Sequence, residues 1–196
     1  MRWQLGVRIV ALVVACQSAV GLASQRQESD QVNPIAAALV DFRERIEAYM
    51  ELRDDITDEV GDAETTRDPA DLRKRENALA SLIQARRAQA KHGDIFTPEL
   101  RGVFRRLLAP LAAGESGRDL RSTLAEDAPA PGAVSLAVNG KYPAGLPVPT
   151  TPGNVILALP PLPPVLEYRI LGKDLILLDR PADVILDYIR NVIKYI

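Results

Sequence analysis

The chain has few of the side chains that carry most enzyme chemistry. Its 196 residues include one cysteine, one histidine and one tryptophan, and only 5% are aromatic. A single histidine, His92, and a single cysteine, Cys16, exclude zinc or copper sites of the usual kind. No phosphate-binding glycine loop, serine elbow or dinucleotide fingerprint appears. We therefore expect no catalytic residue, no metal site and no cofactor.

The overall composition is that of a globular protein with room for one ordinary domain or two small ones. Apolar residues make up 47% of the chain and charged residues 26%. The formal net charge is −2, and it becomes more negative if Arg2 and Arg8 leave with the leader. An acidic protein has no global attraction for nucleic acid, so no nucleic-acid partner is expected.

Residues 1–23 are predicted to be an export signal. Basic residues near the start are followed by the short apolar run "IVALVVA" and then by polar chain. The apolar stretch is broken by Gln17 and Ser18 and is too short to span a bilayer core. We expect the protein to be exported to the periplasm or beyond, with residues 24–33 forming a disordered tether.

Two processing routes remain open. The residues that end at Cys16, "VVAC", resemble a lipobox, in which the cysteine becomes the lipidated first residue. Small residues at Gly21 and Ala23 also allow ordinary cleavage before Ser24 or one residue later. By either route Cys16 is acylated or lost, so no disulfide is expected, and membrane contact is expected only through a lipid anchor.

Residues 34–126 are predicted to be helical. A capping residue followed by proline begins each of three helices, at Asn33-Pro34, Asp68-Pro69 and Thr97-Pro98. After each pair, apolar residues recur at intervals of three and four positions, which places them on one face of a helix. The sequence therefore predicts a bundle of three to four helices.

Glycine and proline indicate where these helices end. We expect the first helix to stop at Gly61 and the second at Gly93, and the third to bend or end at Pro110. Ser116 and Asp119 predict the cap of a short fourth helix.

Charge is distributed unevenly along the helical region, because residues 41–64 are acidic and residues 67–106 are basic. One interpretation is an antiparallel helix pair whose exposed charges complement one another. The other is an anion-binding face on the second helix, formed by six basic residues: Arg73, Lys74, Arg75, Arg86, Arg87 and Lys91.

The region 127–196 is predicted to combine a proline-rich segment with a small module of hairpin and helix. Residues 127–164 hold most of the prolines and almost no charge, which favours irregular chain packed over the helices. Alternation within Val134–Val138, followed by Asn139-Gly140, predicts a short strand and a tight turn.

A two-residue turn at Gly172-Lys173 predicts a hairpin. It would pair Ile170 with Leu175, Tyr168 with Leu177 and Leu166 with Asp179. Such a hairpin is marginal alone, so it needs a partner element.

A final helix is predicted beyond the hairpin, beginning near Pro181. Its apolar face would comprise Val184, Ile185, Tyr188, Ile189, Val192 and Ile193. The predicted fold class is therefore α+β.

The run "LPPLPP" before the hairpin has two interpretations. It could be a polyproline ligand for a partner domain, or the stiff start of the folded hairpin. Its flanks are charge-poor and lead directly into the first strand, which favours a structural role.

Other distinctive residues have ordinary explanations. His92 is expected at a helix end, partly exposed. The acidic residues around Asp55 and Asp58 are expected on a solvated helix face, because the glycine-centred spacing of a calcium loop is absent. Tyr168 is expected to anchor the hairpin face, and Tyr142 to stack on nearby prolines.

Two resemblances can be given. The stretches "KHGDIFTPELRGVFRRLL" and "LPPLPPVLEYRILGKDLILLDRPADVILDYI" resemble a group of uncharacterised exported proteins of environmental bacteria, which implies export and an α+β fold. Residues 159–193 are also similar to the C-terminal module of periplasmic proteins linked to nickel and cobalt homeostasis, which implies an accessory role in metal stress.

The leading functional hypothesis is a non-enzymatic structural or protein-interaction module with a protein partner in the cell envelope. One alternative is a hydrolase that uses carboxylates alone, which requires two acidic side chains roughly 5–10 Å apart in a concave pocket. The other is a metal-stress accessory protein.

Overall fold

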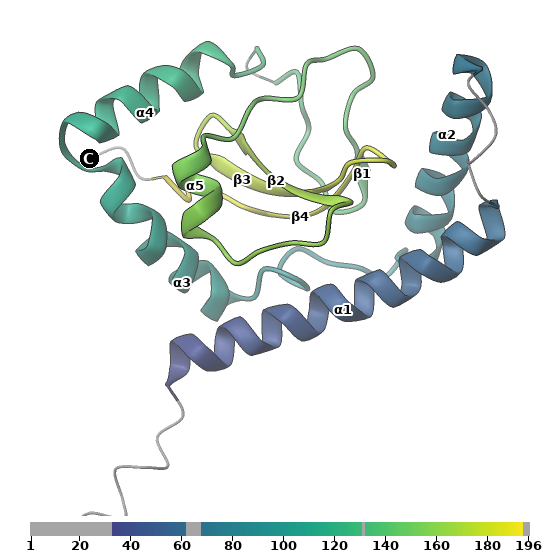
Figure 1. Ribbon diagram of the computed structural model, residues 1–196, viewed down its shortest axis with the longest axis horizontal. Helices are drawn as coiled ribbons and strands as arrows, with labels where there is room; N and C mark the ends of the chain where they lie inside the picture. Colours follow the sequence, from purple (N-terminus) through teal and green to yellow (C-terminus); the bar gives the residue numbers. More distant parts are fainter. Residues whose placement is uncertain (1–32, 62–67, 131, 194–196) are drawn as a thin grey trace, which may run out of the picture. The chain divides into compact units, whose positions relative to one another are not determined.

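The computed structural model describes residues 33–61, 68–130 and 132–193. Within these ranges, helices accompany an antiparallel four-stranded sheet (Figure 1), so the predicted α+β class is confirmed. The predicted export signal, with Cys16, and all of the predicted tether except Asn33 lie outside the described residues.

The three predicted helix starts are confirmed. Helices α1 (Pro34–Val60), α2 (Pro69–Arg86) and α3 (Pro98–Leu108) each begin at the proline of a predicted pair. The side chains of Asp68 and Thr97 accept backbone N–H groups in the first turns of their helices. Proline has no N–H to satisfy at this position, so each pair fits a helix start.

The helix ends agree with the sequence in part. α1 ends just before Gly61, as expected, and α3 ends at Leu108, where the 3₁₀ helix η1 (Ala109–Ala112) that contains Pro110 follows. α2 stops at Arg86, so the end predicted for it at Gly93 is wrong. Gly93 instead lies in the following loop, where its N–H donates to the Asp187 side chain. Helix α4 (Gly114–Glu126) begins earlier than the predicted cap at Ser116.

The sheet contains four strands in the order β1-β4-β3-β2. Strands β2 (Leu166–Leu171) and β3 (Asp174–Asp179) form the predicted hairpin, in the predicted register: Leu166 opposite Asp179, Tyr168 opposite Leu177 and Ile170 opposite Leu175. Gly172 adopts a positive φ of 63°, which the tight turn requires.

The predicted final helix is wrong, because this segment is strand β4 (Val184–Ile189), paired with β3. Almost all of β4 is buried, so it lacks the polar alternation that marks a strand with one solvated face. A short apolar run of this kind fits a helix and a strand equally well by periodicity alone. Its valine, isoleucine and tyrosine favour the strand once a partner is available.

The proline-rich segment also differs from its prediction. The structure has no strand at Val134–Val138, and strand β1 (Gly140–Lys141) instead pairs with β4. The short helix α5 (Gly153–Ala158), between Pro152 and the proline run, was not predicted. Prolines that limit a helix at both ends leave too few residues for a periodic pattern.

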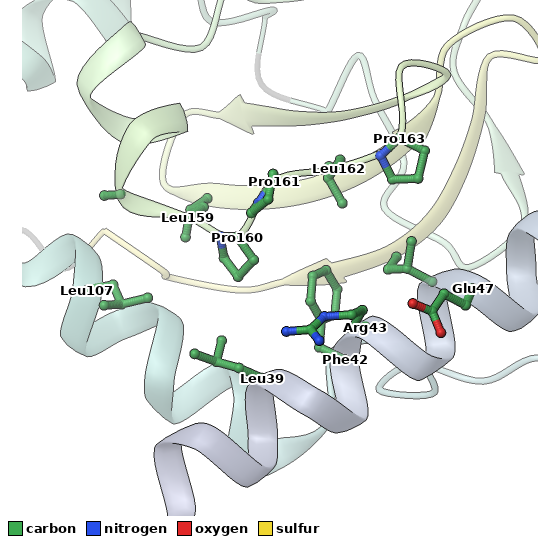
Figure 2. Close-up of a pocket in the computed structure, with 12 residues that line it drawn as sticks. Leu39, Phe42, Arg43, Glu47, Leu107, Leu159, Pro160, Pro161, Leu162 and Pro163 are labelled. Carbon is green, nitrogen blue, oxygen red and sulfur yellow. The ribbon is translucent and has the colours of Figure 1, made fainter.

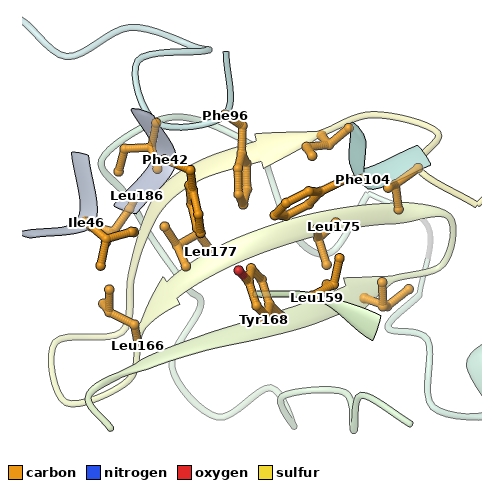
Figure 3. Close-up of a cluster of buried hydrophobic side chains, with 14 of the residues drawn as sticks. Phe42, Ile46, Phe96, Phe104, Leu159, Leu166, Tyr168, Leu175, Leu177 and Leu186 are labelled. Atoms are coloured by element: carbon orange, nitrogen blue, oxygen red, sulfur yellow. The ribbon is translucent and has the colours of Figure 1, made fainter. Parts of the chain in front are cut away.

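Both faces of the sheet are buried. On one face, Tyr168 packs with phenylalanines from α1, α3 and the loop before α3 (Figure 3), so residues from 34–126 and 127–196 share one core. On the other face, Ile176, Leu178 and Ile185 pack with Tyr142 of the proline-rich segment. This segment therefore covers the sheet, and not only the helices as predicted.

Tyr142 and Tyr168, which lie in the two hydrophobic clusters of the sheet, differ in their hydrogen bonds. Tyr142 donates its hydroxyl to the Pro147 carbonyl at 2.9 Å. The hydroxyl of Tyr168 is buried without a partner among the described residues, and burial raises its pKa. A buried donor without an acceptor destabilises the folded state.

We expect Tyr168→Phe to raise the free energy of unfolding by about 1–3 kcal/mol, because it removes the buried hydroxyl and keeps the ring. Tyr142→Phe is the matched control, and it should lower that free energy by about 0.5–1.5 kcal/mol because it removes a satisfied hydrogen bond. Urea denaturation measures both changes. Destabilisation by Tyr168→Phe would show that its hydroxyl has a partner.

Candidate functional site

An apolar groove of about 670 Å³ lies between α1, the end of α3 and the proline run that precedes β2 (Figure 2). Its charged lining side chains are Arg43 and Glu47. The other lining residues are aliphatic, aromatic or proline: Leu39, Phe42, Ile46, Leu107, Ala158, Leu159, Pro160, Pro161, Leu162 and Pro163.

Helix α1 forms one wall of the groove, with residues that recur at intervals of three and four positions and so lie on one face of the helix. Phe42 and Ile46 lie four positions apart and belong to the buried core. The Phe42 ring centroid lies 6.1 Å from that of Phe96 and 5.7 Å from that of Phe104. This aromatic packing fixes the α1 wall, because rings held on several sides have little freedom to move.

The opposite wall is the proline run. Pro160, Pro161 and Pro163 have fixed φ angles, and the Pro163 carbonyl accepts the Leu166 N–H at the start of β2. Leu159, at the start of the run, is buried in the core. The run is thus part of the folded structure and leads into the hairpin.

Two of these prolines, Pro160 and Pro161, also border a second hollow of about 230 Å³. Pro160, Pro161 and Leu162 line both hollows, and Ile156 of α5 lines the second. The run is therefore a ridge between two depressions.

Most of the exposed large apolar side chains come from the elements that line the groove. Leu157 is 88% exposed, and Ile156, beside it on α5, is 50% exposed. Of the large apolar residues exposed in the described part of the chain, all but Leu72 come from α5, the end of α3 and the first turns of α1: Ile35, Val40, Leu107, Ile156 and Leu157. Exposed apolar residues concentrated on these three elements differ from single exposed leucines scattered over a surface, which are normal.

Arg43 and Glu47 lie one helical turn apart on α1 and are both exposed. Figure 2 shows both side chains on the α1 side of the groove. Within the described residues, neither side chain forms an ion pair or hydrogen bond with another. The groove therefore carries two opposite charges that are not paired with each other.

Asp179 is a fully buried carboxylate that joins α1 to the sheet. It accepts the Tyr49 hydroxyl at 2.7 Å and the Arg53 Nε–H at 2.7 Å. Its other oxygen accepts the Ala182 N–H at 3.1 Å, where the turn to β4 begins. Burial and the Asp179 charge raise the pKa of Tyr49, so the hydroxyl stays a donor.

Asp187 on β4 is also fully buried, and it holds the loop before α3. Its carboxylate accepts the backbone N–H groups of Gly93, Ile95 and Phe96 at 3.2 Å or less. Both fully buried carboxylates thus have hydrogen-bond partners within the chain. Asp179 and Asp187 therefore have structural roles: they hold segments of the fold together, and neither lines a hollow described above.

His92 is exposed, as expected, but the helix end predicted for it is wrong, because α2 stops at Arg86 and His92 lies in the loop that follows. Its ring stacks on Tyr188 with ring centroids 4.3 Å apart. One of its ring nitrogens lies 3.0 Å from the Tyr188 carbonyl oxygen. The histidine therefore helps to attach the loop after α2 to β4.

Two residues of the predicted anion-binding face are engaged inside the chain. Arg86 pairs with Glu59 of α1 at 2.6 Å. Arg87 is half-buried and donates to Asn139 at 2.8 Å and to the Leu186 carbonyl at 3.3 Å, and burial lowers its pKa.

The other members of that face are Arg73, Lys74 and Arg75 near the start of α2, and Lys91 beyond its end. The six residues are therefore divided between the start of α2 and its end with the loop beyond. Anion binding by those near the start of α2 stays a prediction.

Acidic side chains do not gather in the hollows of the described structure. The groove contains Glu47 and the second hollow contains Glu167, each as its one carboxylate. Asp55 and Asp58 are exposed on α1, as expected. The described residues contain no group of three or more side chains arranged to hold a metal ion, and none of their helices is long and apolar enough to cross a membrane.

Comparison of the chain with models of protein families, with curated proteins and with solved structures finds no significant match.

We expect Arg53→Met to lower the free energy of unfolding by about 3–5 kcal/mol, because it leaves the Asp179 carboxylate buried without its cation. The double variant Arg53→Met/Asp179→Asn should recover most of this loss, since it removes both charges, keeps an acceptor for the Ala182 N–H and places an NH2 donor beside the Tyr49 hydroxyl oxygen, which can accept it. Chemical denaturation of the single and double variants tests this coupling. A double variant as unstable as the summed singles would contradict it.

Proposed function

We propose that this protein is a non-enzymatic interaction module of the cell envelope, which binds a protein partner at the apolar groove. The observation that carries the proposal is the groove of about 670 Å³ with Leu157 exposed beside it. Exposed apolar surface that is contiguous and hollowed is typical of interaction sites, because a partner removes it from water.

The extent of the exposed apolar surface favours a protein partner over a small molecule. The exposed apolar residues reach beyond the groove along α1 and α5, and the ridge of prolines separates two hollows. A small molecule is normally enclosed by its pocket, with most of its surface buried. A surface with both a ridge and hollows offers complementary contacts to a folded partner.

The groove chemistry favours binding over hydrolysis. A carboxylate-only hydrolase needs a second acidic side chain facing the first across the pocket. Among the described residues that line the groove, Arg43 accompanies Glu47, and the remainder are apolar. The envelope location is part of the proposal and rests on the export signal predicted for residues 1–23.

Site-specific photocrosslinking in the native envelope tests this proposal. A photoreactive amino acid at Leu157 should give a discrete adduct with a protein, because the groove and its rim would be covered by the partner. The same amino acid at Leu72 is the matched control, since Leu72 is an exposed leucine on α2, outside the cluster around the groove. Denaturing electrophoresis and mass spectrometry detect the adduct. Equal crosslinking at the two positions, or none at Leu157, would contradict the proposal.

A further inference from the structure

The surface around the groove has a projecting part and a hollow part side by side. Leu157 is 88% exposed and immediately precedes Ala158, which lines the groove. In a two-fold symmetric interface the same patch is used by both subunits, so the projection of each copy meets the hollow of the other. A patch that has both shapes can therefore form a complementary interface with the same patch on a second copy of the chain.

The charges in the groove have the same self-complementary property. Arg43 and Glu47 lie four positions apart on α1, or about 6 Å along the helix axis. If two α1 helices cross in opposite directions about an axis midway between these residues, Arg43 of each copy faces Glu47 of the other. Two ion pairs then form from side chains that have no ion pair among the described residues of one chain.

A second copy also accounts for apolar surface that a small ligand would leave in water. A molecule held inside the groove contacts its lining, but it does not cover Leu157 or Ile156, which lie on α5 outside that lining. A second copy of the chain removes both the groove and its apolar rim from water.

We infer that the groove is the interface of a two-fold symmetric homodimer, in which Leu157 of each chain enters the groove of the other and Arg43 pairs with Glu47 across the axis. The inference rests on the proposed function and names the partner as a second copy of this chain.

Analytical ultracentrifugation of the protein purified after export tests the dimer. The wild-type protein should sediment as a dimer that dissociates on dilution. Leu157→Asp should raise the dissociation constant by about a hundredfold or more, because it places a charge in an apolar groove. Leu72→Asp, at the exposed leucine of α2, should leave it unchanged. A wild-type monomer at about 100 μM, or equal effects of the two substitutions, would overturn the inference.

Charge reversal tests the arrangement of the two chains. R43E and E47R should each weaken the homodimer by roughly tenfold, because each opposes like charges twice across the axis. An equimolar mixture of R43E and E47R chains should recover wild-type association, since two negative charges then face two positive charges. The double variant R43E/E47R should recover it as well. Failure of both the mixture and the double variant to recover would overturn the proposed pairing.

The crosslinking experiment separates failure of the dimer from failure of the proposed function. A monomeric protein that crosslinks from Leu157 to a different envelope protein overturns the dimer and leaves the interaction module standing. A monomeric protein without any adduct overturns both.

Discussion

The buried carboxylate of Asp179 is the contact on which the arrangement of helix and sheet depends. It accepts hydrogen bonds from Tyr49 and Arg53 of α1, and it also accepts the Ala182 N–H in the turn that leads from β3 into β4. Because β3 pairs directly with β2, this contact fixes α1 relative to β2, the strand that follows the proline run. The two walls of the groove are thus held together by a charge that lies outside the groove itself.

The features that follow from a few neighbouring residues could be predicted from the sequence. Helices α1, α2 and α3 each begin at the proline of a predicted pair, and the β2–β3 register follows from the turn at Gly172. In both cases a short stretch of chain limits its own backbone, so little tertiary information is needed. The apolar face of α1, including Phe42 and Ile46, was also predictable for this reason.

The remaining features depend on contacts between distant segments. β4 was mistaken for a helix because its apolar residues are buried on both faces, by α1 and α3 on one side and Tyr142 on the other. The groove joins α1 to residues 158–163, and sequence periodicity does not show which segments will face each other. The exposure of Leu157 was equally hidden, since its sequence neighbours are as apolar as those of a core leucine.

The proline wall has a thermodynamic consequence for whatever covers the groove. Pro160, Pro161 and Pro163 have one fixed backbone angle each and almost no side-chain rotation. Most of their conformational entropy is therefore lost when the chain folds, and little is left to lose when the groove is filled. Association at this wall keeps a larger share of the apolar free energy than association at a wall of flexible side chains of equal area.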